Sequence, residues 1–157
     1  MNELATVQLL ALPVPLWAAS TQSSRELFRE FELIAAGGPG AHPLPAELTA
    51  LVAALTSDYE GVSTAQEEEL EAAHAEGRQV VERLVFQVPP QVAGACQVLG
   101  DMMDEADGYC RQGTHLLTLA ADAEVVAFRR WYLVEFIRQI NGASPVPWPE
   151  YDGYWPV

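Results

Sequence analysis

Several carboxylates crowd the stretch "DMMDEADGYC", which covers residues 101–110. Asp104 and Glu105 follow Asp101 by three and four positions, so on a helix the three side chains would be neighbours. Such carboxylates are suitable oxygen ligands for a divalent cation, and a pair of them could act as general acid and base. The same spacing also arises on the solvated side of any acidic helix. The cluster 101–107, together with His115, therefore defines an alternative function: a small-molecule or metal-binding sensor or enzyme.

No sequence motif indicates a reaction that these carboxylates could catalyse. The chain has no phosphate-binding loop and no G-x-S-x-G elbow, and "GGPG" at 37–40 leads into His-Pro instead of a helix. All 8 basic residues are Arg, so no lysine is available for a Schiff base. His42, His74 and His115 are widely separated in the sequence. We therefore expect no catalytic residue, no resident metal and no cofactor.

The charge balance narrows the choice of partners. There are 22 acidic and 8 basic residues, which give a formal net charge of −14 at pH 7. Such a chain repels phosphate backbones and anionic membrane surfaces, so we expect neither nucleic-acid nor membrane binding. The first residues lack the positive segment of a signal peptide, and Cys96 and Cys110 are too far apart on one predicted helix to form a disulfide. These features predict a cytoplasmic protein.

Short apolar runs precede three helical segments. "VQLLALPVPL" precedes a helix expected at 23–36, and "VERLVFQVPP" precedes one at 91–112. "HLLTLAAD" precedes a third helix at 123–140, for which Asp122 is a natural N-cap. These strand-to-helix units predict an α+β fold that is helix-rich overall, with a small sheet of about three strands covered by long helices.

We expect one α+β domain over 1–142 and a separate C-terminal tail over 143–157. Four prolines keep the tail out of regular structure, and its aromatic residues are too many for an idle linker. Within the domain, residues 45–77 read as an acidic helical insert. The carboxylates between 58 and 76 are by default a solvated surface, and otherwise a docking surface for a basic partner.

The second helix of this insert has a recognisable start. "GVSTAQEEELEAAHAEG" offers a capping box, either Thr64 with Glu67 or Ser63 with Gln66. The helix that follows has little to bury apart from Leu70 and Ala73, so we expect it on the surface.

The helix expected at 123–140 places Arg129 near the centre of a broad apolar side. Burying an unpaired guanidinium costs several kcal/mol, so a carboxylate must meet it or its stem must reach solvent. We predict a buried ion pair between Arg129 and one of Asp101, Asp104 or Asp107. The alternative is an Arg129 whose head extends to solvent at the edge of the core.

Trp131 falls on the opposite side of the same helix, in a small apolar patch flanked by cations. Either the aromatic tail folds back over this patch or a second chain covers it. Trp and Arg together are typical of interface hot spots. The residues predicted to form an interface are Arg130, Trp131, Arg138, Trp148, Tyr151 and Trp155.

Several segments of the chain resemble a family of short actinobacterial proteins: "VQLLALPVPLW", "RELFREFELIA", "STAQEEELEAA", "DEADGYCRQGTHLLTLA" and "VAFRRWYLVEFIRQINGASPVPWP". The resemblance covers nearly the whole chain. It implies an association with partner-switching regulators, namely anti-sigma-type ATPases, STAS-domain antagonists and their phosphatases. The chain lacks the E-L-V-x-N-A and D-x-G-x-G boxes of the anti-sigma kinase fold, so ATP binding of that kind is not expected.

These inferences together predict a cytoplasmic regulatory or adaptor protein that acts through protein–protein interaction. Its partner would be a regulatory protein or a second copy of the same chain. The interface would use the Trp131 side and the tail, with the acidic helix as a second candidate surface.

Overall fold

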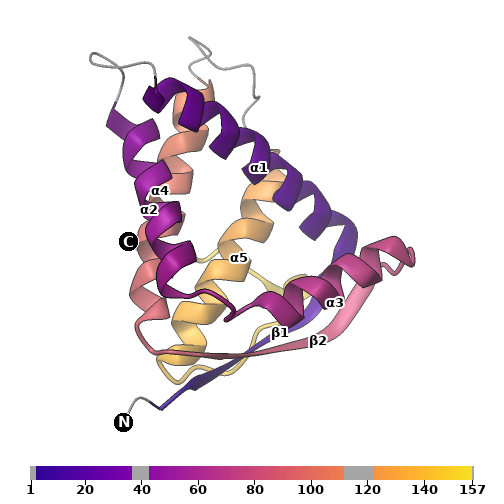
Figure 1. The fold of residues 1–157 in the computed structure, drawn as a ribbon. Coiled ribbons are helices and arrows are strands. Elements are labelled where there is room, and N and C mark those ends of the chain that lie inside the picture. Colours follow the sequence, from indigo (N-terminus) through magenta and orange to yellow (C-terminus); the bar gives the residue numbers. More distant parts are fainter. Residues whose placement is uncertain (1–2, 37–42, 112–121, 157) are drawn as a thin grey trace.

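The computed structural model describes residues 3–36, 43–111 and 122–156. Its elements follow in the order β1 (Ala5–Pro13), α1 (Val14–Ala36), α2 (Pro43–Asp58), α3 (Thr64–Ala75), β2 (Val80–Val88), α4 (Val92–Arg111), α5 (Ala123–Ile140) and the short 3-10 helix η1 (Trp148–Glu150). The two strands lie along one edge of the molecule, and α5 runs through the middle with α1 on one side and α2 and α4 on the other (Figure 1). The fold is α+β and helix-rich.

The sheet of the described residues contains two strands, whereas about three were predicted. β1 and β2 pair in antiparallel register, from Ala5 opposite Val88 to Pro13 opposite Val80. The third predicted strand, at 115–122, falls almost entirely on residues outside the described ranges. Two antiparallel strands can be joined by a tight turn, but here the connection is long, because α1, α2 and α3 all lie between the two strands in the sequence.

Ala11 changes which side of β1 faces the core. Its positive φ of 54° is strained for a residue with a Cβ, at a cost of about 1 kcal/mol. Alternate residues Val7 and Leu9 are buried before this point, and Leu12 is buried after it. The distortion therefore keeps the apolar residues of the whole strand against the helices.

Glutamine side chains bond to the outer edges of both strands at one rung of the ladder. Gln8 lies opposite Val85. The side-chain amide of Gln139 accepts from the backbone N of Gln8 and donates to its backbone O, both at 2.8 Å. On the other edge, Gln66 Nε2 donates to the backbone O of Val85 at 2.7 Å. These contacts satisfy backbone groups that a two-stranded sheet leaves open, and they attach α5 and α3 to opposite edges.

Two predicted details of the helices are wrong. The first helix begins at Val14 and not near residue 23, because Pro13 ends the strand and Pro15 is tolerated in a first helical turn. Neither form of the capping box is present at α3. Ser63 occupies the N-cap position with φ −116° and ψ 9°, outside the extended region typical of capping residues, and it makes no side-chain capping bond.

Two clusters of buried side chains form the core. The larger one joins both strands to α3, α4 and α5, and the few buried residues of α3 that contribute to it are the predicted Leu70 and Ala73. The smaller one lies between α1, α2 and α4, with Phe31 and Leu48 fully buried at its centre. Both α1 and α4 contribute to the two clusters, and α5 contributes to the larger one.

Candidate functional site

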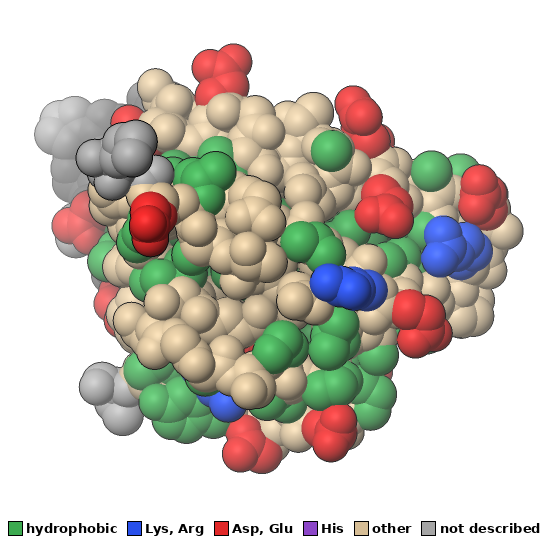
Figure 2. All heavy atoms as spheres, turned by 90° about the horizontal axis from the view of Figure 1, so that it is seen from below, with side chains coloured by type: hydrophobic (Ala, Val, Ile, Leu, Met, Phe, Trp, Pro, Cys, Tyr) green, Lys and Arg blue, Asp and Glu red, His purple; other side chains and the backbone are tan. Residues whose placement is uncertain are grey.

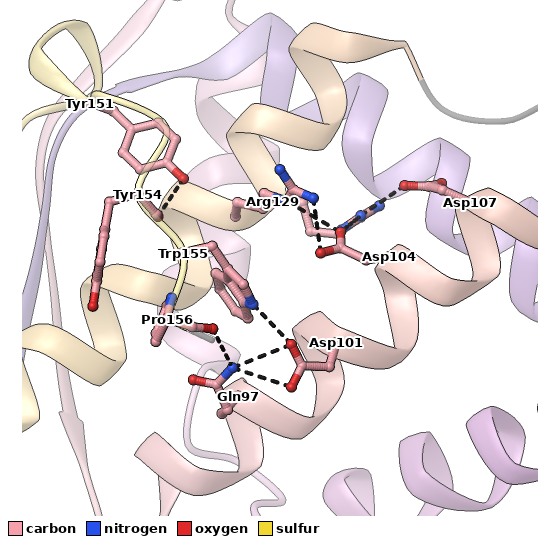
Figure 3. Close-up of polar contacts among 10 residues, drawn as sticks. Gln97, Asp101, Asp104, Asp107, Arg129, Tyr151, Tyr154, Trp155 and Pro156 are labelled. Atoms are coloured by element: carbon pink, nitrogen blue, oxygen red, sulfur yellow. Dashed lines mark hydrogen bonds and ion pairs between the residues drawn. The ribbon is translucent and has the colours of Figure 1, made fainter.

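Arg129 forms a buried ion pair between α5 and α4. Its Nη2 lies 2.8 Å from Asp104 Oδ1 and 2.8 Å from Asp107 Oδ2 (Figure 3). Arg129 is 8% exposed and Asp107 is 5% exposed, so this contact is shielded from water. The structure therefore brings Arg129 together with two of the three carboxylates predicted for it. Its Nε is buried and has no hydrogen-bond partner over the described residues.

Asp101, the third predicted partner, does not contact Arg129. It accepts hydrogen bonds from Gln97 Nε2 at 3.3 and 3.2 Å and from Trp155 Nε1 at 2.9 Å (Figure 3). Asp101 lies three residues, slightly less than one turn, before Asp104 on α4, and it contacts the returning tail instead of Arg129. Asp104 has a second cation, because Arg130 Nη2 lies 3.0 Å from its Oδ2.

These contacts engage three of the carboxylates of 101–107 that could have held a cation. Over the described ranges, no group of three or more His, Cys, Asp or Glu side chains is placed to hold a metal ion. His115, which was considered with the cluster, lies outside the described residues.

The tail, residues 143–156, covers Trp131. The indole is 0% exposed, and its Nε1 donates to the backbone O of Val146 at 2.8 Å. Trp148 packs edge-on against it, with ring centroids 5.7 Å apart. Of the two coverings considered for this patch, the structure shows the intramolecular one. The prediction that Trp131 lies in an interface with another chain is wrong. A helical projection shows that this side of α5 is partly apolar, but it does not show that the tail of the same chain covers it.

Glu135 holds the start of the tail, and it is a residue that the sequence analysis missed. It is 0% exposed, and its Oε1 accepts from the backbone N of Val146 at 2.7 Å and from Gln139 Nε2 at 3.0 Å. Its Oε2 lies 3.0 Å from Arg138 Nη1. The available signal was a carboxylate between Val134 and Phe136 in a helix otherwise rich in buried residues.

The end of the tail is seated on α4 at Gly100. A Cβ at this position would overlap the indole ring of Trp155. Trp148 and Tyr151 stack with ring centroids 6.1 Å apart, and the Tyr151 hydroxyl donates to the backbone O of Tyr154 at 2.8 Å. The signal for this site was a glycine in the interior of a long helix, where glycine costs stability unless another group approaches closely.

All the residues predicted for an interface therefore contact other parts of the same chain. Arg130 and Arg138 pair with carboxylates, Trp131 is enclosed, and the tail aromatics are only partly exposed: Trp148, Tyr151 and Trp155. Where α4, α5 and the tail meet, these predicted interface side chains therefore stabilise the fold through contacts within the chain.

The side formed by α3 is different. Glu68, Glu69 and Glu71 of α3, with Glu76 directly after the helix, are exposed, and we call this group of carboxylates the acidic ridge. No ion pair to any of them is present among the described residues. In the view of Figure 2, acidic side chains are spread around the surface and few basic ones lie among them. The ridge is therefore an unneutralised stretch of surface.

A cavity of about 520 Å³ opens beside the start of α3. Its walls come from α1, α2, the α2–α3 linker, α3, β2, α4 and α5, and they are largely apolar. Burial raises the pKa of the Cys96 thiol in this wall to about 12. Burial, together with the nearby charge of Glu67, also raises the pKa of the Tyr132 hydroxyl above its ordinary value. Both groups are therefore neutral near pH 7.

No known protein family, curated protein or solved structure matches this chain. Among the helices of the described residues, none is both long enough and apolar enough to cross a bilayer.

Proposed function

We propose that this protein is a cytoplasmic regulatory or adaptor protein that binds a basic segment of another protein through the acidic ridge. The observation that carries this proposal is the concentration of exposed carboxylates on and directly after one helix, with no ion-pair partner for any of them over the described residues: Glu68, Glu69, Glu71 and Glu76. Like charges close together on one helix repel one another, and a basic partner would relieve that repulsion.

The construction of α3 supports a role in binding. Leu70 and Ala73 are its buried residues, so most of the helix surface contributes nothing to the core. The other candidate surface, around Trp131, is already occupied by the tail. Charge on an exposed ridge speeds encounter with a partner of opposite charge more than it tightens the complex. Association should therefore weaken as the salt concentration rises.

The resemblance noted in the sequence suggests the kind of partner. We propose that the partner is one of the partner-switching regulators of the anti-sigma type. The alternative is a homodimer, which sedimentation at increasing protein concentration would reveal.

The test is a pull-down from an extract of the source cell with three versions of the full chain. The first is the unchanged protein, and the second carries Glu68→Gln, Glu69→Gln and Glu71→Gln. The third is a matched control, Glu3→Gln, Glu82→Gln and Glu124→Gln, which removes the same charge from exposed positions elsewhere. We expect the unchanged protein and the control to recover a regulatory protein, and the ridge variant to lose it.

Two results would overturn the proposal. One is that the unchanged protein recovers no regulatory protein at low salt. The other is that the ridge variant recovers the same partner as efficiently as the control.

A further inference from the structure

The cavity beside α3 has the size and composition of a small-molecule site. Its volume of about 520 Å³ lies within the range of roughly 300–1,000 Å³ that is common for ligand pockets. Phe86 and Val88 of β2, together with Phe136 of α5, contribute to the side next to the sheet. Ala95 and Leu99 of α4 contribute further apolar surface. An apolar molecule would therefore be removed from water on several sides at once.

Polar groups in the lining are few and are all neutral or negative. Glu60 and Glu67 are the charged residues of the described lining of this cavity. The adjoining cavity that shares Glu67 is also lined by Arg25 and Arg129, and Arg129 is already paired with Asp104 and Asp107. The hydroxyl of Tyr132 makes no side-chain hydrogen bond among the described residues, and it is not a fully buried polar atom, so it can accept a hydrogen bond from a ligand. A neutral acceptor close to a carboxylate matches a ligand group that carries N–H donors and positive charge.

Glu67 and Tyr132 also line an adjoining cavity of about 430 Å³ next to α1, and Phe28 and Leu99 are shared by the two spaces as well. The charged and hydroxyl groups thus lie where the two cavities meet. Glu67 itself is exposed, so its carboxylate reaches water while Tyr132 is only partly exposed. This arrangement suits a ligand with one polar end and an apolar body.

We propose that this cavity binds an apolar small molecule with a protonated amine at one end, held by Glu67 and Tyr132. The proposal goes beyond binding of a protein by the acidic ridge, because it concerns a different set of side chains and needs no partner. An anionic ligand would meet only carboxylates in the main cavity, and a neutral one would lack the charge attraction. The amine is therefore the preferred class.

The experiment measures displacement of the neutral dye N-phenyl-1-naphthylamine from the full chain. The competitors are decylamine, decanol and decanoate, which share one chain length, each used below its micelle concentration. We expect decylamine to displace the dye best and decanoate least. The variant Glu67→Gln should weaken decylamine by about tenfold, to the level of decanol, since a charge-assisted contact is replaced by a neutral one.

Glu68→Gln is the matched control, because it removes the same charge from the neighbouring position, which does not line the cavity. We expect it to leave the competition unchanged. A second variant, Ala95→Phe, places a ring in the cavity and should abolish dye binding. Circular dichroism checks that it folds. If it does not fold, the comparison of Glu67→Gln with Glu68→Gln decides the matter, because both positions are exposed.

Failure to bind the dye would overturn the proposal. So would equal displacement by decylamine and decanoate. An equal loss of decylamine binding in both glutamine variants would also overturn it, because this would mean that the amine binds to the acidic surface in general. None of these outcomes depends on whether a protein partner exists, so failure here is distinguishable from failure of the proposed function.

Discussion

The region where α4, α5 and the tail meet and the region formed by α2, α3 and their linker use polar residues in different ways. In the first, Arg129, Trp131 and Glu135 are buried and each has a partner in the same chain. In the second, the carboxylates of the acidic ridge lack ion-pair partners over the described residues, and a cavity remains beside them. Residues typical of interface hot spots, such as Trp131 with its neighbouring arginines, can therefore form a contact within one chain. Groups without partners are a better indication of a binding surface.

The largest effect is expected at Trp131, the centre of the contact with the tail. Trp131→Ala removes a fully buried indole and its bond to Val146. We expect a loss of about 3–5 kcal/mol in the free energy of unfolding, and a melting temperature lower by roughly 10 °C. Calorimetry or thermal circular dichroism measures this. A loss below about 1 kcal/mol would mean that the tail is not part of the folded core.

Arg129→Met should be almost as damaging. It leaves Asp107 buried without its cation, which typically costs about 3 kcal/mol. Arg130→Met is the matched control, because the Arg130 side chain is 38% exposed and its pair with Asp104 should be worth at most about 1 kcal/mol. Urea unfolding of both variants gives the comparison. Equal losses would show that burial of the Arg129 pair has no special importance.

Gly100→Ala should lower stability by about 1–3 kcal/mol, because the new methyl group overlaps Trp155 and must displace it. The same substitution at Gly94 on the same helix meets nothing within 4 Å. Gly94→Ala should therefore stabilise the protein by roughly 0.5–1 kcal/mol, the usual gain in a helix interior. Thermal unfolding distinguishes the two. Stabilisation by both changes would contradict the seating of the tail on α4.

Alkaline pH should weaken the contact of the tail. Partial burial raises the pKa of Tyr151 to about 12, against 10.0 for the free side chain. The folded protein therefore keeps this proton when the unfolded chain has lost it, so stability present below pH 10 is lost as the pH rises toward 12. Cys96 acts in the same direction. The urea midpoint should fall as the pH rises from about 10 toward 12, and fall less in Tyr151→Phe. An identical fall in both proteins would contradict this role of Tyr151.

The smallest effect on stability is expected at the acidic ridge. The triple change Glu68→Gln, Glu69→Gln and Glu71→Gln alters exposed side chains, so the free energy of unfolding should change by no more than about 0.5 kcal/mol. Relief of repulsion favours a small gain over a loss. A large loss in a urea titration would show that the ridge has a structural role, and would weaken its assignment to binding.

The parts of the fold that could be predicted depend on local pattern. The helix at 123–140 has the predicted limits, because its apolar periodicity and its flanking residues are both encoded nearby. The need to neutralise a buried guanidinium directed Arg129 to the carboxylates of the preceding helix. Which of them it would meet depends on how α4 and α5 cross, and the sequence does not contain that angle.

Other features depend on contacts between distant segments. The pairing of Glu135 with Val146 and the close approach of Trp155 to Gly100 arise only when the tail folds back. In one of the two capping boxes considered, Gln66 would cap its own helix, but its side chain bonds to β2 instead. The cavity beside α3 has walls from helices, a strand and a linker that lie far apart in the sequence, and no single stretch of residues indicates it.

Hydrogen exchange of the protein alone and in complex with the partner recovered by the pull-down shows whether the partner binds the α3 side or the tail side. If the α3 side binds and the tail side closes the fold, the partner should slow exchange over 58–76 and leave 143–156 unchanged. Slower exchange confined to 143–156 would contradict binding at the acidic ridge, because it would mean that the partner binds the tail side.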